Sequence, residues 1–393
     1  MPRKLGILRF NMSKLTVAVI FGSRSTEHDI SIVTAIASVI KPLELSGKYN
    51  VVPVYIDKQG KWYSDPLLSD INLYSSGNIE AFLSKLKPLA IRMDGKLELV
   101  LKRKKVITID VAFPATHGTH GEDGELMGLL EMAGVAYVGC PMPAAALAMD
   151  KALAKTLAAA EGIPTSKFEW FYARDFAADQ EAVLSKLADL KYPLFVKPVH
   201  LGSSIAISRV ENSKALVQAI EVAAHYDDKV LVEEAVNNLI EVTVPIIGNH
   251  HPRAALVEQP LLKNSNLFDF ETKYLSGGKK GKGGKSGAQG YSKLPADLPP
   301  KLYKQAEETA LKVYKTLGCA GTARVDLLID SQTSQVYFNE VNPLPGSLYA
   351  HNWRQAGVSN VGLVEELVDL ALERELESKK LTTAFSSNYL KQY

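Results

Sequence analysis

Cysteine is nearly absent from this chain. Only Cys140 and Cys319 occur among its 393 residues, so no disulfide framework holds the fold together, and the sequence fits a reducing compartment. Apolar runs of membrane-spanning length are also absent. The basic start MPRKLGILRFNMSK lacks the apolar core and cleavage-like site of a signal peptide. We therefore expect a cytoplasmic protein with no membrane contact.

A strong excess of one charge is absent as well. Lys and Arg number 45 against 43 Asp and Glu, and this balance argues against a dedicated nucleic-acid-binding protein. The length predicts two or three domains with large cores. Met12 directly precedes the first strand-like segment, so we expect residues 1–14 to be a disordered extension.

Residues 277–287 read GGKKGKGGKSG and resemble a phosphate-binding P-loop only in part. The ending Gly284-Lys285-Ser286 fits that motif, but Lys279 occupies the position of its first glycine. The flanking segments are polar and mixed, whereas a P-loop joins a buried strand to a helix. A flexible surface loop is the simpler interpretation.

Strand-like and helix-like segments alternate along the chain, which predicts α/β architecture. Strands are expected over 15–21, 51–57 and 106–115, and one helix over 143–162. We place an N-terminal α/β domain at 15–139, a central domain at 140–235 and a C-terminal domain at 236–380. A polar tail, 381–393, follows.

Two adjacent strand-like segments, 322–330 and 335–342, carry the most informative polar residues. If Asp330 pairs with Val336 across the intervening turn, Asp326 lies opposite Glu340 and Arg324 opposite Asn342. Facing carboxylates destabilise a sheet, and a hard cation between them reverses that effect. Asp, Glu and Asn oxygens suit Mg²⁺. The alternative is a solvated sheet face on which Arg324 neutralises one carboxylate.

Lys197 lies inside the apolar segment PLFVKPV. Buried lysines are rarely unpaired, so an anionic group should meet it. The next segment, HLGSS, can offer backbone N–H groups and hydroxyls to phosphate oxygens. Lys151 is either another phosphate ligand or part of a solvated helix face.

Two loops that follow predicted strands carry further candidates. Glu27 and His28 lie in a strand-to-helix loop, where ligands of open α/β sheets usually bind. His117 and His120 lie in THGTHGEDG. No tetrahedral ligand set accompanies them, so a substrate-binding or structural loop is favoured over zinc.

Taken together, these motifs resemble those of the D-alanine–D-alanine ligases, members of the ATP-grasp superfamily. The resemblance covers most of residues 15–376 and rests on FGSRSTEHDIS, HGTHGEDGELMGLLEMAGVAYVG, ALAMDKALAK, PLFVKPVHLGSS, KVLVEEAV, FDFETKYLS, GTARVDLLID and NEVNPLPG. It implies a three-domain ATP-grasp architecture (α/β, α+β) with a Rossmann-like N-terminal domain. It also implies ATP-dependent joining of two D-alanines through an acyl phosphate, for peptidoglycan synthesis.

The resemblance also implies roles for individual residues. Catalytic roles fall to Glu27, Ser203, Tyr274, Arg324 and the amide of Gly346. The D-alanine contacts are His117, Ser347 and Leu348. The ATP contacts are Lys151, Lys197, Ser204, Glu233, Glu234 and Lys273. Asp326, Glu340 and Asn342 would hold two Mg²⁺ ions, with Mn²⁺ as an alternative metal. Relatives are usually homodimers.

Two departures from the family pattern affect the substrate contacts. Leu239 stands where many relatives have a ribose-binding glutamate, close to Glu241. The segment after Gly346 is about four residues shorter than usual, which leaves the acceptor open. An acceptor such as D-lactate or another amino acid, or a non-catalytic binding role, remains an alternative. Tyr274 favours an amine acceptor.

The glycine-lysine run falls where the family has a mobile active-site loop, here 275–292. Closure of such a loop excludes water from the reactive intermediate. Its lysines either assist closure over ATP or serve only as part of a spacer.

Overall fold

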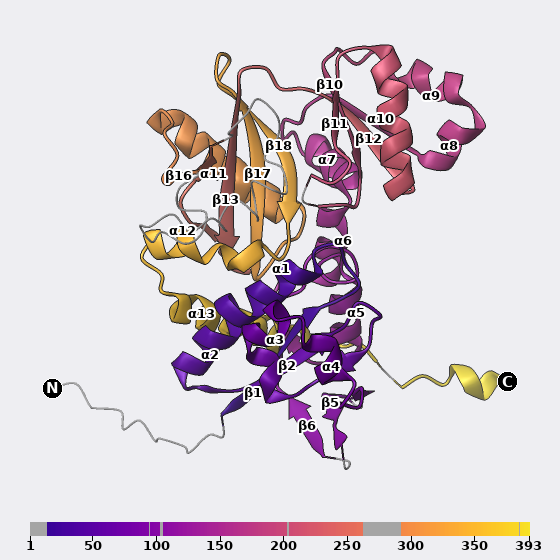
Figure 1. Ribbon diagram of the computed structural model, residues 1–393. Helices are drawn as coiled ribbons and strands as arrows, with labels where there is room; N and C mark the ends of the chain where they lie inside the picture. The colour runs from indigo at the N-terminus through magenta and orange to yellow at the C-terminus, as the bar shows by residue number, and fades with distance from the viewer. Residues whose placement is uncertain (1–13, 94, 103–104, 203, 262–291, 385) are drawn as a thin grey trace.

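Figure 1 shows the computed structural model, which describes residues 14–93, 95–102, 105–202, 204–261, 292–384 and 386–393. The predictions for residues 1–13, for Ser203, Lys273 and Tyr274, and for the glycine-lysine loop over 275–291 fall outside this part of the chain. Three main sheets follow one another along the sequence, and we name the N-terminal, central and C-terminal units after them. None of the described helices has the length and apolar composition needed to cross a lipid bilayer.

The N-terminal unit is built on a mostly parallel sheet. In sheet order its strands are β3 (Trp62–Tyr63), β2 (Tyr49–Ile56), β1 (Leu15–Gly22), β7 (Val111–Pro114) and β8 (Ala136–Tyr137). Alternate residues of β1 point to opposite faces, and both sets are buried. Parallel sheets need cover on both faces. The helical run α1 (His28–Val33), η1 (Thr34–Ile40, a π-helix) and α2 (Lys41–Ser46) packs on one face, and α5 (Glu125–Met132) packs on the other.

The expectation of a single strand over 106–115 is wrong. Asp110 ends one strand, β6 (Val106–Ile109), before β7 begins. Its carboxylate accepts a hydrogen bond from the Thr16 N–H at 2.7 Å. The chain therefore leaves a small antiparallel sheet and enters the main sheet at this residue. The remaining elements here are η2 (Pro66–Ser69), α3 (Ile71–Ser75), α4 (Ile79–Leu83), β4 (Ala90–Met93) and β5 (Leu97–Val100).

The central unit is an antiparallel sheet with helices on one face. Its strands in order are β11 (Ser208–Val210), β10 (Leu194–Pro198), β12 (Lys229–Glu234) and β9 (Phe168–Tyr172). The helices α8 (Ala173–Ala178), α9 (Gln180–Leu187) and α10 (Ser213–Tyr226) share one apolar core with these strands. On the other face, Leu231 of β12 packs with Ala152 and Val199 in a separate small cluster.

The predicted helix over 143–162 is two helices. α6 (Met142–Met149) ends at Asp150, whose φ of −88° and ψ of 93° are not helical, and α7 (Lys151–Ala160) begins directly after it. The Asp150 carboxylate accepts the Leu153 N–H at 2.8 Å. Aspartate is a favoured N-cap because it satisfies such an amide. The break therefore puts Lys151 at the first position of a new helix.

The C-terminal unit is a second antiparallel sheet, drawn beside the central one at the top of Figure 1. Its strands in order are β14 (Arg253–Ala254), β13 (Leu239–Ile247), β17 (Thr322–Asp330) and β18 (Gln335–Asn342). α11 (Pro300–Thr316), α6 and α7 share its apolar core. The unit also contains β15 (Gln259–Pro260), β16 (Ser292–Lys293), η6 (Gly346–Tyr349), α12 (Ala350–Gln355), α13 (Asn360–Ser378) and the tail turn η7 (Tyr389–Gln392).

The last long helix, α13, packs against the N-terminal unit. The apolar side of α13, including Leu363 and Leu367, is buried in the same core as Val17 of β1. Arg374 donates to the backbone oxygens of Gly139 and Tyr137 at 2.6 and 2.7 Å. The N-terminal unit is therefore closed by a helix from the C-terminal end, as Figure 1 shows.

Candidate active site

The hairpin of β17 and β18 brings together the predicted metal-ligand residues. Asp326 lies opposite Glu340 and Arg324 opposite Asn342, as expected. The expected pairing at the turn is wrong by one residue, because Asp330 pairs with Gln335. The register shifts between Asp326 and Leu327, and this bulge leaves the functional end in the predicted alignment.

The charges on this sheet face interact closely. The Arg324 guanidinium donates to both oxygens of Asp326, at 2.7 and 2.5 Å. Asn342 Nδ2 donates to Asp326 at 3.2 Å. Glu340 lies 3.5 Å from the Lys151 ammonium, which comes from α7. Two carboxylates and one amide oxygen form a hard donor set of the kind that Mg²⁺ takes, so the residues present fit a magnesium site.

Lys151 links this hairpin to the central unit. Its ammonium donates to the backbone oxygen of Leu201 at 2.8 Å and lies 3.4 Å from that of Val199. Its side chain is 7% exposed. The interpretation of Lys151 as part of a solvated helix face is therefore wrong, because the side chain points inward between two sheets.

Lys197 meets the anionic partner that its burial required, and this partner is Glu233. One Glu233 oxygen pairs with Lys197, and the other lies 3.0 Å from the Lys155 ammonium and accepts from Ser166 at 2.7 Å. Burial disfavours the charged carboxylate, but the two ammonium groups outweigh it and hold the pKa of Glu233 far below its usual range. The sequence reasoning missed Lys155, although its spacing of four residues from Lys151 puts both on one helix face.

A small pocket borders this buried group. Its lining comes from β10, β12, β13 and the hairpin, and consists of Phe195, Lys197, Glu233, Glu234, Val236, Leu239, Leu328 and Asn339. Leu239, the departure from the family pattern, is thus a wall of the pocket. Both Glu233 oxygens are engaged within the protein, so its predicted contact with ATP would come from the backbone rather than the carboxylate.

The Glu27 carboxylate lies between two loops of different units. A β-carbon added to Gly118 would stand 3.1 Å from Glu27 Oε2, and one added to Gly202 would stand 3.0 Å from it. Glycine at both positions therefore lets the loops approach this carboxylate. Gly202 directly precedes Ser203, which like Glu27 is a predicted catalytic residue, and Ser204 has a φ of +58°. His28 is buried beneath this site, bonded to Ser23 O at 2.6 Å and Tyr55 OH at 3.0 Å.

The two histidines of the THGTHGEDG loop have different surroundings. His117 is buried, and its Nε2 lies 2.9 Å from Thr34 Oγ1. Near it, burial and then the Glu27 charge raise the pKa of Glu122 to about 8. Glu122 accepts the Gly118 N–H at 2.7 Å. His120 instead points outward and bonds Glu125 at 2.6 Å.

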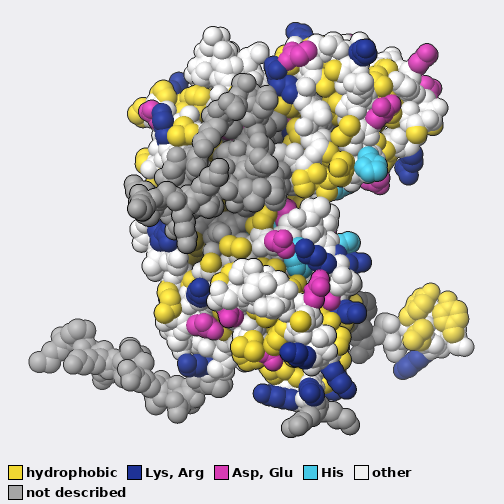
Figure 2. Space-filling model, in the orientation of Figure 1, with side chains coloured by type: hydrophobic (Ala, Val, Ile, Leu, Met, Phe, Trp, Pro, Cys, Tyr) yellow, Lys and Arg dark blue, Asp and Glu magenta, His cyan; other side chains and the backbone are white. Residues whose placement is uncertain are grey.

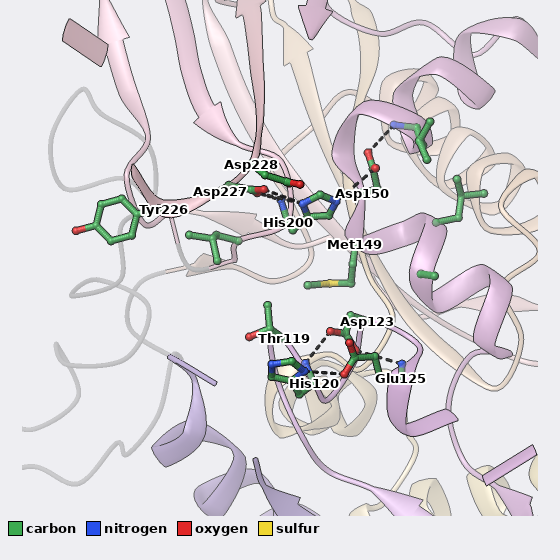
Figure 3. Close-up of a pocket in the computed structure, with 14 residues that line it drawn as sticks. Thr119, His120, Asp123, Glu125, Met149, Asp150, His200, Tyr226, Asp227 and Asp228 are labelled. Carbon is green, nitrogen blue, oxygen red and sulfur yellow. Dashed lines mark hydrogen bonds and ion pairs between the residues drawn. The ribbon is translucent and has the colours of Figure 1, made fainter. Parts of the chain in front are cut away.

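A cleft of about 680 Å³ opens on this outer side, between the N-terminal and central units. Figure 3 shows His120, Asp123 and Glu125 on one wall and His200, Asp227 and Asp228 on the other. Figure 2 shows a hollow in the surface between the N-terminal and central units. Hydrogen bonds to Asp150 and Asp227 raise the pKa of His200 to about 9.

The predicted D-alanine contacts Ser347 and Leu348 lie in the turn η6, which begins at Gly346. Ser347, Leu348 and Tyr349 all have left-handed backbone, with φ of 51°, 54° and 51°. The Leu348 side chain is buried in the core of the N-terminal unit, so only its backbone is available to a substrate. The Arg324 guanidinium lies over the Tyr349 ring at 5.1 Å, another neighbour that sequence reasoning missed.

Comparison with known proteins gives consistent matches along the chain. A family model described as "D-ala D-ala ligase N-terminus" matches residues 16–140, and one described as "D-ala D-ala ligase C-terminus" matches 157–369. The D-alanine--D-alanine ligase of Caldicellulosiruptor bescii is 35% identical over 381 residues, which cover 94% of this chain and 98% of that protein. That of Acetivibrio thermocellus is 36% identical, with 93% and 98% covered.

Solved structures agree with these relatives. The D-alanine-D-alanine ligase of Coxiella burnetii has a TM-score of 0.79 at 30% identity, covering 94% of this chain and 97% of its own. The VanG D-Ala:D-Ser ligase of Enterococcus faecalis has a TM-score of 0.75 at 30% identity, covering 91% and 100%. Two antiparallel sheets facing each other across lysines and paired carboxylates, with an N-terminal α/β unit, define an ATP-grasp enzyme. More narrowly, the chain belongs to the D-alanine–D-alanine ligase family.

Proposed function

We propose that this protein joins two molecules of D-alanine into D-alanyl-D-alanine, a peptidoglycan precursor, at the expense of ATP. The observation that carries the proposal is the meeting of Glu340 and Lys151, which brings the β17–β18 carboxylates to a lysine that we propose binds phosphate. A carboxylate substrate and a polyphosphate carry dense negative charge. A site that joins them needs positive groups held in advance, and this arrangement supplies them.

The proposed nucleotide contacts are Lys151, Lys197, Ser204, Glu233, Glu234 and Lys273. Asp326, Glu340 and Asn342 would hold two divalent ions, Mg²⁺ or Mn²⁺. When bound there, these ions neutralise phosphate charge and orient the phosphates. Arg324 is oriented by Asp326, so its guanidinium is held close to the same site.

The proposed reaction has two steps. A carboxylate oxygen of the first D-alanine attacks the γ-phosphorus of ATP, and ADP leaves with the electron pair of the broken P–O bond. The free amine of the second D-alanine then attacks the acyl carbon, loses a proton, and expels inorganic phosphate. Arg324 and the Gly346 N–H would stabilise the tetrahedral oxyanion. Glu27 would hold the ammonium group of the first D-alanine, together with Ser203 and Tyr274.

D-Serine is a second candidate for the acceptor. The VanG structure belongs to a D-Ala:D-Ser ligase and is as similar in sequence as the structure from Coxiella burnetii. The proposed acceptor contacts Ser347 and Leu348 lie in the shortened segment after Gly346.

We also propose a cytoplasmic location, a homodimer, and the division into domains at 15–139, 140–235 and 236–380.

The test is ADP release from ATP with D-alanine, D-serine and D-lactate, with mass analysis of the products. We expect D-alanyl-D-alanine as the main product with Mg²⁺ present. Glu340→Gln should abolish turnover while the protein stays folded. The control Asp330→Asn, on the same hairpin at its exposed turn, should keep normal activity. Absence of ATP turnover with every acceptor would reject the ligase, and near-normal activity of Glu340→Gln would reject the metal site.

A further inference from the structure

The turn that carries the Gly346 amide has an unusual backbone. Three successive residues, Ser347 to Tyr349, have positive φ although none is glycine. A non-glycine residue in this region is strained, and it persists only where its surroundings impose the conformation. We therefore expect other parts of the protein to hold the chain on both sides of Gly346.

Those contacts come from the N-terminal unit. The Ser347 N–H donates to Thr34 Oγ1 at 3.0 Å, and Thr34 Oγ1 lies 2.9 Å from His117 Nε2. On the other side of Gly346, the Leu344 N–H donates to Glu122 at 3.4 Å. Thr34 Oγ1 thus contacts both His117, a predicted D-alanine contact, and the turn that carries the proposed acceptor contacts Ser347 and Leu348.

The direction of these bonds follows from the donors available. Ser347 N–H can only donate, so Thr34 Oγ1 accepts, and the hydroxyl proton of this buried side chain needs its own acceptor. His117 Nε2 is that acceptor when the imidazole is neutral. Burial lowers the pKa of His117, which agrees with a neutral ring. His117 then carries its proton on Nδ1.

The setting of Thr34 favours a specific role for its hydroxyl. It opens the π-helix η1 in the apolar stretch ISIVTAIASVI, and π-helical turns occur often at functional sites. A helical threonine commonly returns its hydroxyl to the carbonyl four residues earlier. The bonds described for Thr34 instead leave the helix and cross to two other segments.

We propose that Thr34 is a positioning residue for the acceptor half of the reaction, holding His117 and the Ser347 turn in one arrangement. The inference rests on the proposed ligase function. Loss of the hydroxyl would leave the Ser347 N–H and the His117 ring without this partner, and the turn that presents the Gly346 amide would lose its hydrogen bond to Thr34. Loss of the hydroxyl should lower kcat/KM for the second D-alanine, and the KM for ATP should stay nearly unchanged.

Thr34→Val removes the hydroxyl and keeps the shape, whereas Thr34→Ser keeps the hydroxyl. Ser38→Ala, one turn later in the same π-helix, is the matched control. We expect Thr34→Val to lower kcat/KM for the second D-alanine by about tenfold to hundredfold. This is the effect expected when one buried hydrogen bond is lost and its partner is left unsatisfied. The KM for ATP should change by less than about twofold. Thr34→Ser and Ser38→Ala should stay close to the wild type.

A second readout does not depend on activity. In nitrogen-15 spectra of histidine-labelled protein, with the signal assigned through His117→Gln, wild type and Thr34→Ser should show a neutral Nδ1–H ring. Thr34→Val should shift the Nε2 signal. The proposal is overturned if Thr34→Val leaves both the acceptor kinetics and this signal unchanged, or if folded Thr34→Ser fails as badly as Thr34→Val. An inactive wild type would reject the ligase function separately.

Discussion

Replacing Glu233 by glutamine tests the buried charge cluster at the centre of the protein. The side chains of Lys155, Glu233 and Lys197 are 0%, 3% and 5% exposed. At the 3.0 Å that separates Lys155 from Glu233, Coulomb's law with an effective dielectric constant of about 20 gives roughly 5 kcal/mol of attraction. Removal of one partner from a buried ion pair typically costs about 3–5 kcal/mol. We therefore expect Glu233→Gln to lower the free energy of unfolding by about 3–5 kcal/mol.

The measurement is urea unfolding of the ligand-free protein at pH 7, followed by tryptophan fluorescence. Trp170 lies on β9, paired with Leu231 of the strand that carries Glu233, so it reports on this unit. Glu234→Gln is the matched control, because the neighbouring carboxylate accepts a hydrogen bond from a peripheral backbone N–H, that of Lys191 at 2.9 Å. It should cost less than about 1 kcal/mol.

A double variant separates charge from packing. If the cost arises from two unpaired ammonium groups, adding Lys155→Met to Glu233→Gln should recover part of the stability.

The pH dependence of this contribution has a defined sign. Since the pKa of Glu233 is depressed in the folded state, its contribution is present above about pH 4.3 and is lost as the pH falls. A Glu233→Gln variant within 1 kcal/mol of wild type, or a double variant less stable than the single one, would refute this reasoning.

Two further predictions concern pH and backbone conformation. His200 has a pKa raised to about 9 by Asp150 and Asp227, so its stabilisation is complete below pH about 6.5 and disappears as the pH rises through about 9. His200→Gln should flatten the fall in Tm between pH 7 and 9.5, and an unchanged slope contradicts the assignment. Gly321 and Gly318 have nearly the same left-handed backbone, with φ of 69° and 70°. Their surroundings differ, because a β-carbon on Gly321 would lie 2.9 Å from a backbone oxygen, whereas one on Gly318 would meet nothing within 4 Å. Gly321→Ala should therefore be the less stable variant in thermal unfolding, by about 1–3 kcal/mol, and equal stabilities would show that the contact is relieved.

The sequence predicted the chemistry best where local spacing decides the geometry. Asp326 and Glu340 face each other because strand side chains alternate, and this period holds across the hairpin. The pairing near the turn was missed because a bulge shifts the register by one residue, and a bulge leaves no clear mark in a single sequence. Likewise, Asp150 ends one helix and caps the next, although AMDKALAK reads as a continuous helical pattern.

Other parts of the site depend on contacts between distant segments. Thr34 meets His117 across 83 residues and Ser347 across 313, and Lys155 meets Glu233 only once α7 has packed against the central sheet. A hydroxyl in an apolar helix and a second lysine one turn after the first are weak signals by themselves. They acquire meaning only when the fold supplies their partners.

The same contacts explain why the site requires all three units to be assembled. Glu27 of the N-terminal unit lies against Gly202 of the central unit. Lys151, at the start of α7, meets Glu340 of the C-terminal sheet. The Gly346 turn belongs to the C-terminal unit, yet its neighbouring amides bond to Thr34 and Glu122 of the N-terminal unit. Because α13 is buried in the core of the N-terminal unit, the Gly346 turn and the loop that carries Glu27 are held in one packed body. The two proposed D-alanine subsites would therefore be held in a fixed arrangement.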